Sequence, residues 1–137
     1  LAHGNNGDND SAITDYTEAI RLDPEFAEAY YWRGYAHLNN GDNDSAITDY
    51  TEAIRLNPEY ADAYHDRGLA HYFNDDNAAA ISDYTEAIRL DPEYDVAYFH
   101  RGEVHKRIGN RAEAKADFRK AEELGYEAGT YRIADGQ

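Results

Sequence analysis

One run of sixteen residues occurs twice in this chain without a change, at a separation of 34 residues. GDNDSAITDYTEAIRL fills positions 7–22 and returns at 41–56. An altered copy, DDNAAAISDYTEAIRL, fills 75–90, and a more divergent one, GNRAEAKADFRKAEEL, fills 109–124. A fixed period of this size indicates a repeat array, in which similar units stack side by side. Because a catalytic site is normally a unique constellation, the repetition argues against catalysis.

Within one unit, residues 27–60, the apolar residues mark two helical stretches separated by a turn. In AEAYYWRGYAHLNN and again in SAITDYTEAIRL they recur at steps of three and four, which is helical spacing. Between these stretches, Gly41 suits a left-handed helix end, and Asp42 offers an N-cap for the second helix. The unit is therefore predicted to be a helical hairpin.

Small and large residues alternate where the two helices of each hairpin must touch. Glycine lies midway along each first helix, at Gly34, Gly68 and Gly102. Large rings recur on the second helices, at Tyr16, Tyr50, Tyr84 and Phe118. A lone hairpin cannot enclose its apolar faces, so neighbouring hairpins must stack to bury them.

This combination of features resembles the tetratricopeptide repeat family. The unit has 34 residues, an aromatic residue and a Gly in its first helix (helix A), two Ala flanking a Tyr in its second (helix B), and a closing Pro. The resemblance extends to about Leu124. It implies an all-α, right-handed superhelix of three to four hairpins that serves as a non-catalytic scaffold for protein interaction.

We expect one domain, 1–137, with Leu1, Ala2 and His3 as the tail of an incomplete first helix. Its parts are a truncated repeat (1–26), two full repeats (27–60 and 61–94) and a divergent repeat with a C-terminal cap (95–137). The isoleucine pairs Ile13/Ile20, Ile47/Ile54 and Ile81/Ile88 should face the next hairpin. Lys115 and Glu122 replace this pair in the last copy, which indicates a cap, and Tyr126 and Tyr131 are expected to cover the end.

Arginine stands where the family usually has Leu before the helix A glycine. It does so at Arg33, Arg67 and Arg101. We expect an internal ladder of ion pairs with the acids repeated on helix B, at Asp15, Asp49, Asp83 and Asp117.

The charge balance and the histidines exclude several kinds of site. With 13 Lys and Arg against 28 Asp and Glu, the net charge of −15 opposes binding to nucleic acid and to anionic membranes. No apolar run suits membrane insertion, and the absence of Cys removes Cys-based chemistry. Histidine recurs once per repeat, at His3, His37, His71 and His105, which is too far apart for shared metal ligation. We predict no enzymatic activity, no metal site and no cofactor.

In the family, helix A lines a concave groove that holds a segment of a partner. The resemblance places twelve side chains of this chain there: Tyr31, Trp32, Tyr35, His65, Asp66, Leu69, Tyr72, Phe73, Phe99, His100, Glu103 and Lys106. Aromatic residues are enriched in binding hot spots, and we expect Trp32 and Tyr35 to be exposed anchors. The acidic charge favours a protein or peptide whose apolar or aromatic side chains are separated by basic residues.

Some family members clamp the C-terminal carboxylate of heat-shock chaperones with Lys, Asn and Arg. The corresponding residues here are Tyr31, Tyr35, Asp66, Val96 and His100, none of which matches. Binding of chaperone tails is therefore disfavoured.

Two alternatives stay open. In the first, the truncated N-terminal end of one copy meets the basic stripe Arg111, Lys115 and Arg119 of another, giving head-to-tail homo-oligomers. In the second, the chain is an accessory domain of a larger enzyme. A cytoplasmic location is the default expectation, and an upstream signal sequence is left open because the chain begins at Leu1 without Met.

Overall fold

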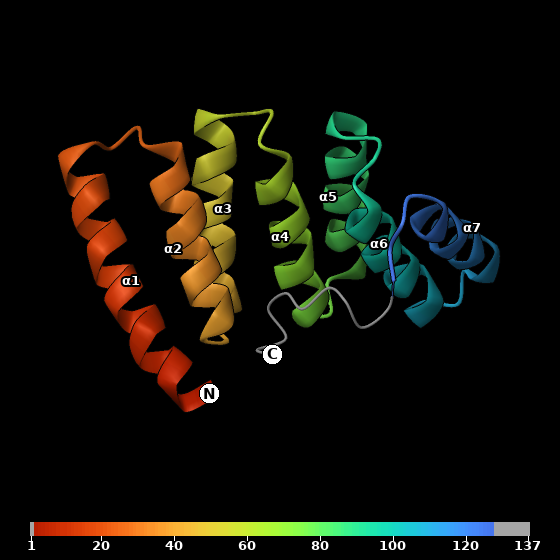
Figure 1. Ribbon diagram of the computed structural model, residues 1–137, viewed down its shortest axis with the longest axis horizontal. Helices are drawn as coiled ribbons and strands as arrows, with labels where there is room; N and C mark the ends of the chain where they lie inside the picture. Colours follow the sequence, from red (N-terminus) through yellow and green to blue (C-terminus); the bar gives the residue numbers. More distant parts are fainter. Residues whose placement is uncertain (1, 128–137) are drawn as a thin grey trace.

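The computed structural model describes residues 2–127, with side chains from residue 7 onward, and this part of the chain is all α-helical (Figure 1). The helices are α1 (Ala2–Leu22), α2 (Ala27–Asn39), α3 (Asn43–Leu56), α4 (Ala61–Phe73), α5 (Asn77–Leu90), α6 (Asp95–Arg107) and α7 (Arg111–Glu123). The predicted all-α class is confirmed. Among the described helices, none has the length and apolar character that a membrane-spanning helix needs.

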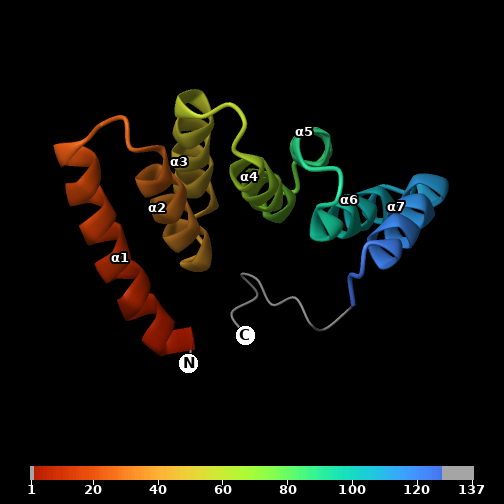
Figure 2. The ribbon, with the colours of Figure 1, turned by 45° about the horizontal axis from the view of Figure 1, so that its top comes forward.

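The helices follow one another along an arch, and α2, α4 and α6 form its inner side (Figure 2). The hairpins α2–α3, α4–α5 and α6–α7 make the most extensive contacts, and each B helix also packs on the next A helix. In addition, α2 contacts α4 and α4 contacts α6, whereas neighbouring B helices do not meet. The A helices are therefore closer together than the B helices, which curves the array around them. We call this inner side the A-face.

The turn between the two helices of a hairpin has the predicted chemistry. Gly41 has φ +81°, a left-handed conformation that glycine adopts without strain. Asp42 then caps α3 by accepting a 3.2 Å hydrogen bond from the backbone N–H of Ser45. In the next copy Asp75 takes the left-handed position with φ 62°, and Asp76 caps α5. The two helices thus reverse within three residues and can pack side by side.

Each hairpin is closed by a helix A glycine against a helix B ring. A Cβ atom added at Gly34 would lie 2.9 Å from Cε1 of Tyr50, a ring that is fully buried. The same approach joins Gly68 to Tyr84 and Gly102 to Phe118. Among the described residues, the Tyr50 and Tyr84 hydroxyls have no hydrogen-bond partner. Phe118, which has no hydroxyl, occupies the equivalent position in the last hairpin. The hairpin therefore needs the ring and not the hydroxyl.

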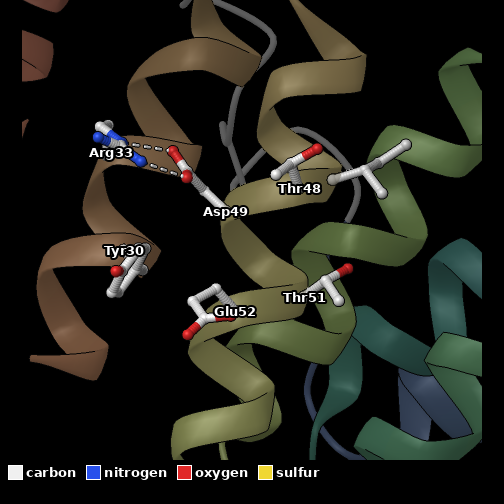
Figure 3. A pocket seen from close by; sticks show the side chains of 7 residues that line it. Tyr30, Arg33, Thr48, Asp49, Thr51 and Glu52 are labelled. Atoms are coloured by element: carbon white, nitrogen blue, oxygen red, sulfur yellow. Dashed lines mark hydrogen bonds and ion pairs between the residues drawn. The ribbon is translucent and has the colours of Figure 1, made fainter. Parts of the chain in front are cut away.

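The predicted ladder of Arg–Asp pairs is confirmed for Asp49, Asp83 and Asp117, as Figure 3 shows for one of its steps. It is wrong for Asp15, which is exposed on α1 and pairs with no arginine among the described residues. Arg33 donates to both carboxylate oxygens of Asp49 at 2.8 Å, from Nε and Nη2, and its Nη1 reaches Thr17 of α1 at 3.2 Å. The same geometry recurs at Arg67–Asp83 and at Arg101–Asp117. Each arginine therefore joins the two helices of its own hairpin to the helix before it.

The prediction of a separate first helix ending at His3 is wrong for the described residues. Helix α1 runs without a break from Ala2 to Leu22, and Gly7 and Asp8 lie inside it. The letters GD lie in the turn before α3 at 41–42 but are helical at 7–8. The turn at 40–42 lets α2 pack back on α3, whereas α1 contacts α2 alone among the described helices. Because no second helix packs back on this part of α1, a turn would gain no tertiary contacts, and the hydrogen bonds of the helix continue through these residues.

Candidate partner-binding face

The twelve residues predicted to line the groove divide into buried and accessible groups. Tyr31, His65, Asp66 and Leu69 are buried, His65 completely. For these four, the prediction of an open lining is wrong, because they pack between adjacent A helices and against the helix B rings. The other eight are half-buried or exposed: Trp32, Tyr35, Tyr72, Phe73, Phe99, His100, Glu103 and Lys106.

An aromatic cluster lies on α2 at the first part of the A-face. The Trp32 side chain is 45% exposed, and its ring meets Tyr31 edge-on, with the ring centroids 4.9 Å apart. Trp32 also meets the half-buried Tyr35 edge-on at 5.6 Å. Beneath them, Tyr31 packs against Tyr60 with centroids 5.0 Å apart. The exposed indole of Trp32 therefore packs against a buried ring, that of Tyr31, which restricts its position.

A chain of polar groups crosses three A helices, with Tyr31, His65 and Asp66 buried and His100 half-buried. The hydroxyl of Tyr31 in α2 donates to Oδ2 of Asp66 in α4 at 2.5 Å. The other oxygen, Oδ1, is 2.8 Å from Nδ1 of His65, whose Nε2 is 3.0 Å from Nδ1 of His100 in α6. Since a carboxylate only accepts, His65 donates from Nδ1, and one proton is shared between His65 Nε2 and His100 Nδ1. The repeat pattern does not require this chain, because each position carries a different residue in every copy.

Burial controls protonation at both ends of this chain. The pKa of His100 is lowered to about 3, mainly because burial disfavours the imidazolium and also because His65 lies beside it. The pKa of the Tyr31 hydroxyl is raised far above its ordinary range by burial and by the charge of Asp66. Near neutral pH, His100 is therefore neutral, and Tyr31 keeps the proton that it donates to Asp66.

The second part of the A-face carries cations beside a small pocket. This pocket, of about 360 Å³, is lined by Tyr72 of α4 and by Glu103, Lys106 and Arg107 of α6. The guanidinium of Arg107 lies 3.7 Å from the centroid of the Tyr72 ring and donates to the Asn77 side chain at 3.0 Å from Nε. Burial raises the pKa of Glu103, and the nearby Lys106 opposes this shift. The two parts of the A-face thus differ in chemistry. The part on α2 is aromatic, and the part between α4 and α6 carries both acidic and basic side chains.

At the C-terminal end, Tyr126 stacks on Phe99 with the ring centroids 4.4 Å apart. Tyr126 therefore packs on α6, the capping of the end stays a prediction, and Tyr131 lies outside the described residues. Lys115 and Glu122 are exposed where the equivalent Ile47 and Ile54 of α3 pack on the core. A pocket of about 560 Å³ lies beside this surface, lined by Lys106, Gly109, Arg111, Ala114, Lys115 and Phe118.

The repeated histidines lie at the hairpin ends, apart from one another. His37 is 3.9 Å from Asp42 and 3.8 Å from Asp49, and His71 has the same surroundings in the next copy. The side chain of His3 lies outside the described side chains. Within the described residues, no three His, Cys, Asp or Glu side chains come together as metal ligands would.

The pocket of Figure 3, of about 490 Å³, is lined by Tyr30, Arg33, Ile47, Thr48, Asp49, Thr51 and Glu52. Its central charges, Arg33 and Asp49, already neutralise each other in the ion-pair ladder. Arg33 also lies over the Tyr30 ring, 5.7 Å from its centroid. The polar groups of this pocket therefore stabilise the hairpin, and the A-face is the stronger candidate for binding.

Stacked hairpins of two helices, repeated every 34 residues, define a class of helical repeat proteins. A family model of the tetratricopeptide repeat matches residues 1–61, 34–95 and 65–128, and the chain belongs to this family. Proteins of this family are generally non-catalytic interaction scaffolds. A search of curated proteins gives no significant match.

Solved structures of the same family are similar to this chain. The crystal structure of MamA is 28% identical, covers 87% of this chain and 70% of its own, and has a TM-score of 0.83. The first tetratricopeptide domain of Spaghetti (RPAP3), bound to the HSP90 peptide SRMEEVD, is 28% identical over 72% of this chain and 79% of its own, with a TM-score of 0.71. The Arabidopsis OM64 domain is 32% identical over 72% of this chain and 82% of its own, with a TM-score of 0.71.

Proposed function

We propose that this protein is a non-catalytic scaffold that binds a segment of a partner protein along the A-face. The observation that supports this most directly is the exposed Trp32 beside Tyr35, mounted on the buried Tyr31. An indole that is nearly half exposed on the first A helix offers a large apolar area at little cost in side-chain entropy. The peptide bound to the RPAP3 domain is consistent with this kind of use.

The surroundings favour a partner with apolar or aromatic side chains separated by Lys or Arg. Glu28 and Asp62 are exposed on α2 and α4, and the chain carries a net charge of −15. Cations are attracted by this field and by the faces of Trp and Tyr rings. An acidic tail is a poorer fit at this part of the face.

Binding would rely on a surface formed in advance. The stacked hairpins and the buried chain from Tyr31 to His100 hold the A helices in one register. The cost of ordering then falls on the partner and not on the scaffold. Such a surface favours a segment that is short and extended or already helical.

A selection from a displayed peptide library against the intact chain tests this proposal. The selected peptides should combine aromatic and basic residues, and their affinity should fall roughly 10- to 30-fold in Trp32→Ala or Tyr35→Ala. Helicity measured by circular dichroism should change little. Ile108→Ala is the matched control, since it removes an equally exposed apolar side chain outside the predicted groove residues. Unchanged affinity in both aromatic variants contradicts the proposal.

A further inference from the structure

Glu103 of α6 occupies a position that a core leucine fills one repeat earlier. Leu69 of α4 is 5% exposed and packs in the core cluster that includes Leu38 and Tyr50. Its equivalent 34 residues later is Glu103, which is half-buried. Because leucine serves at this position in the preceding copy, the stacking of the repeats does not explain the acid.

The carboxylate of Glu103 lacks a partner within the described residues. No group among them donates a hydrogen bond to it, and no cation contacts it directly. The hydroxyl of Tyr84, which takes the place of Tyr50 in this repeat, is buried and also has no hydrogen-bond partner there. The pKa of Tyr84 is raised by burial, by the charge of Asp66 and by that of Glu103, so the hydroxyl and the Glu103 carboxylate lie near each other. A carboxylate partly withdrawn from water without a donor costs free energy, and an incoming N–H would satisfy it.

The two cations beside Glu103 do not satisfy its carboxylate. In the pocket that they line with Tyr72, Arg107 donates from Nε to the Asn77 side chain and from Nη2 to the Tyr72 backbone oxygen at 2.9 Å. Its guanidinium also lies on the Tyr72 ring. Lys106 opposes the rise that burial causes in the pKa of Glu103, but it makes no direct contact and is exposed. Arg107 is thus engaged and Lys106 keeps its hydration, whereas Glu103 gains most from a new partner.

We propose that Glu103 selects a lysine or arginine side chain of the partner segment and binds it in the pocket between α4 and α6. The cation donates to the Glu103 carboxylate, where partial burial strengthens the hydrogen bond. The pocket measures about 360 Å³, which suits one side chain better than a whole small molecule. This inference rests on the proposed function, because it names the residue type that the A-face recognises at one position.

An acidic side chain is a poorer occupant of this pocket. It would meet the charge of Glu103, while Arg107 is already engaged and Lys106 alone would be left to attract it. The net charge of −15 also draws cations and not anions toward the surface. The two occupants are distinguished by sign, because Glu103→Gln would weaken binding of a basic side chain and strengthen binding of an acidic one.

A selection against three forms of the protein tests the inference. A displayed library of short random peptides is selected against the intact chain, against Glu103→Gln and against Glu59→Gln. Glutamine keeps the shape of the side chain and removes its charge. Glu59 is exposed in the turn before α4, so Glu59→Gln is the matched control for the loss of one negative charge. Lysine or arginine should be enriched at one position of the peptides selected by the intact chain and by Glu59→Gln, and this enrichment should be absent with Glu103→Gln.

Affinities of one selected peptide make the assignment quantitative. The peptide most enriched with the intact chain is labelled and compared by fluorescence anisotropy with a version in which glutamine replaces the basic residue. Glu103→Gln should weaken binding of the basic peptide at least ~10-fold, as loss of a charge-assisted hydrogen bond does, and should not weaken binding of the glutamine peptide. Lys106→Gln should strengthen binding of the basic peptide about two- to fivefold, because it removes a like charge beside the bound cation. Circular dichroism checks that both variants keep their helices.

Two results would overturn the inference and leave the proposed function intact. The first is an affinity of the basic peptide that is the same in Glu103→Gln as in the intact chain, although Trp32→Ala or Tyr35→Ala weakens it. The second is enrichment of Asp or Glu, with binding that weakens in Lys106→Gln and strengthens in Glu103→Gln. A selection that yields no binding peptide contradicts the proposed function itself, and this inference with it.

Discussion

Buried carboxylates join the helices in two different ways. Asp49, Asp83 and Asp117 each accept a bidentate arginine, with the same distances in every copy. Asp66 accepts instead from the Tyr31 hydroxyl and from the His65 imidazole. The hydrogen bonds to Asp49, Asp83 and Asp117 raise the pKa of the three arginines, which stay charged, whereas the second arrangement ends in His100, a group that titrates. Stability should therefore respond to pH through His100.

The pH dependence of His100 can be measured on the folded chain. Its pKa is about 3 when folded and near 6.5 when unfolded, so between these values the unfolded chain binds the additional proton. The contribution of His100 is present in full above about pH 6.5 and is lost as pH falls toward 3, by at most about 1.4 kcal/mol per pH unit. His100→Gln should flatten the fall in unfolding free energy measured with urea between about pH 6 and 4. His71→Gln keeps His100 and should retain the slope; an equally steep slope in His100→Gln contradicts the account.

At the scale of helices, the A helices and the B helices have different roles. The B helices repeat nearly the same letters, and their buried alanines and rings serve only packing. The A helices share the Arg-Gly step but differ at the two positions before it, which in α4 and α6 contact the neighbouring A helices. Because the packing is confined to the B helices and one stripe of each A helix, the remaining A-helix positions can vary without loss of the fold.

Two glycines in helices should respond in opposite directions to alanine. Gly68→Ala places a methyl group 2.9 Å from Cε1 of the buried Tyr84 and should lower the unfolding free energy by about 1–3 kcal/mol. Gly7→Ala is the matched control in α1, where nothing lies within 4 Å, and it should raise the unfolding free energy by about 0.5–1 kcal/mol. Urea unfolding followed by circular dichroism measures both. Two changes of the same sign would contradict the close packing of Gly68 on Tyr84.

The whole molecule is a linear array in which each helix meets only near neighbours. Helix α4 contacts α2, α3, α5 and α6, whereas α1 contacts one described helix and α7 also contacts one. Charge is uneven along the array, since residues 1–94 carry 20 acids and 5 bases and residues 95–137 carry 8 of each. In a solenoid the stability of a unit depends on its interfaces, so the ends should open before the centre.

Amide hydrogen exchange can measure this difference in local stability between the ends and the centre of the array. Backbone amides of α4 and α5 should exchange slowest, and those of α1 should exchange roughly tenfold faster or more, because α1 buries only one side. Mass spectrometry of proteolytic fragments gives the rates for each helix. Helix α7 is the internal comparison, since it also has one neighbour but is closed by Tyr126 stacked on Phe99. Equal protection of α1 and α4 would mean that the array opens as one unit.

Much of this architecture could be predicted from the sequence because its causes are local and repeated. The helical hairpins follow from apolar spacing, and the Arg33–Asp49 pair and the contact of Gly34 with Tyr50 follow from residues that return every 34 positions. The exposure of Trp32 was predictable as well, whereas Tyr35, also expected to be exposed, is half-buried.

The rest was decided by what packs against each side chain. His65 and Asp66 carry polar groups typical of a surface, yet adjacent A helices bury them and join them to Tyr31 and His100. The identical runs at 7–22 and 41–56 make the same point, because Gly7 and Asp8 are helical in the first, whereas Gly41 and Asp42 form the turn before α3 in the second. Local preference cannot distinguish two copies of one sequence. The presence of α2 against α3, and the contact of α1 with α2 alone among the described helices, determine which conformation and which buried face each copy adopts.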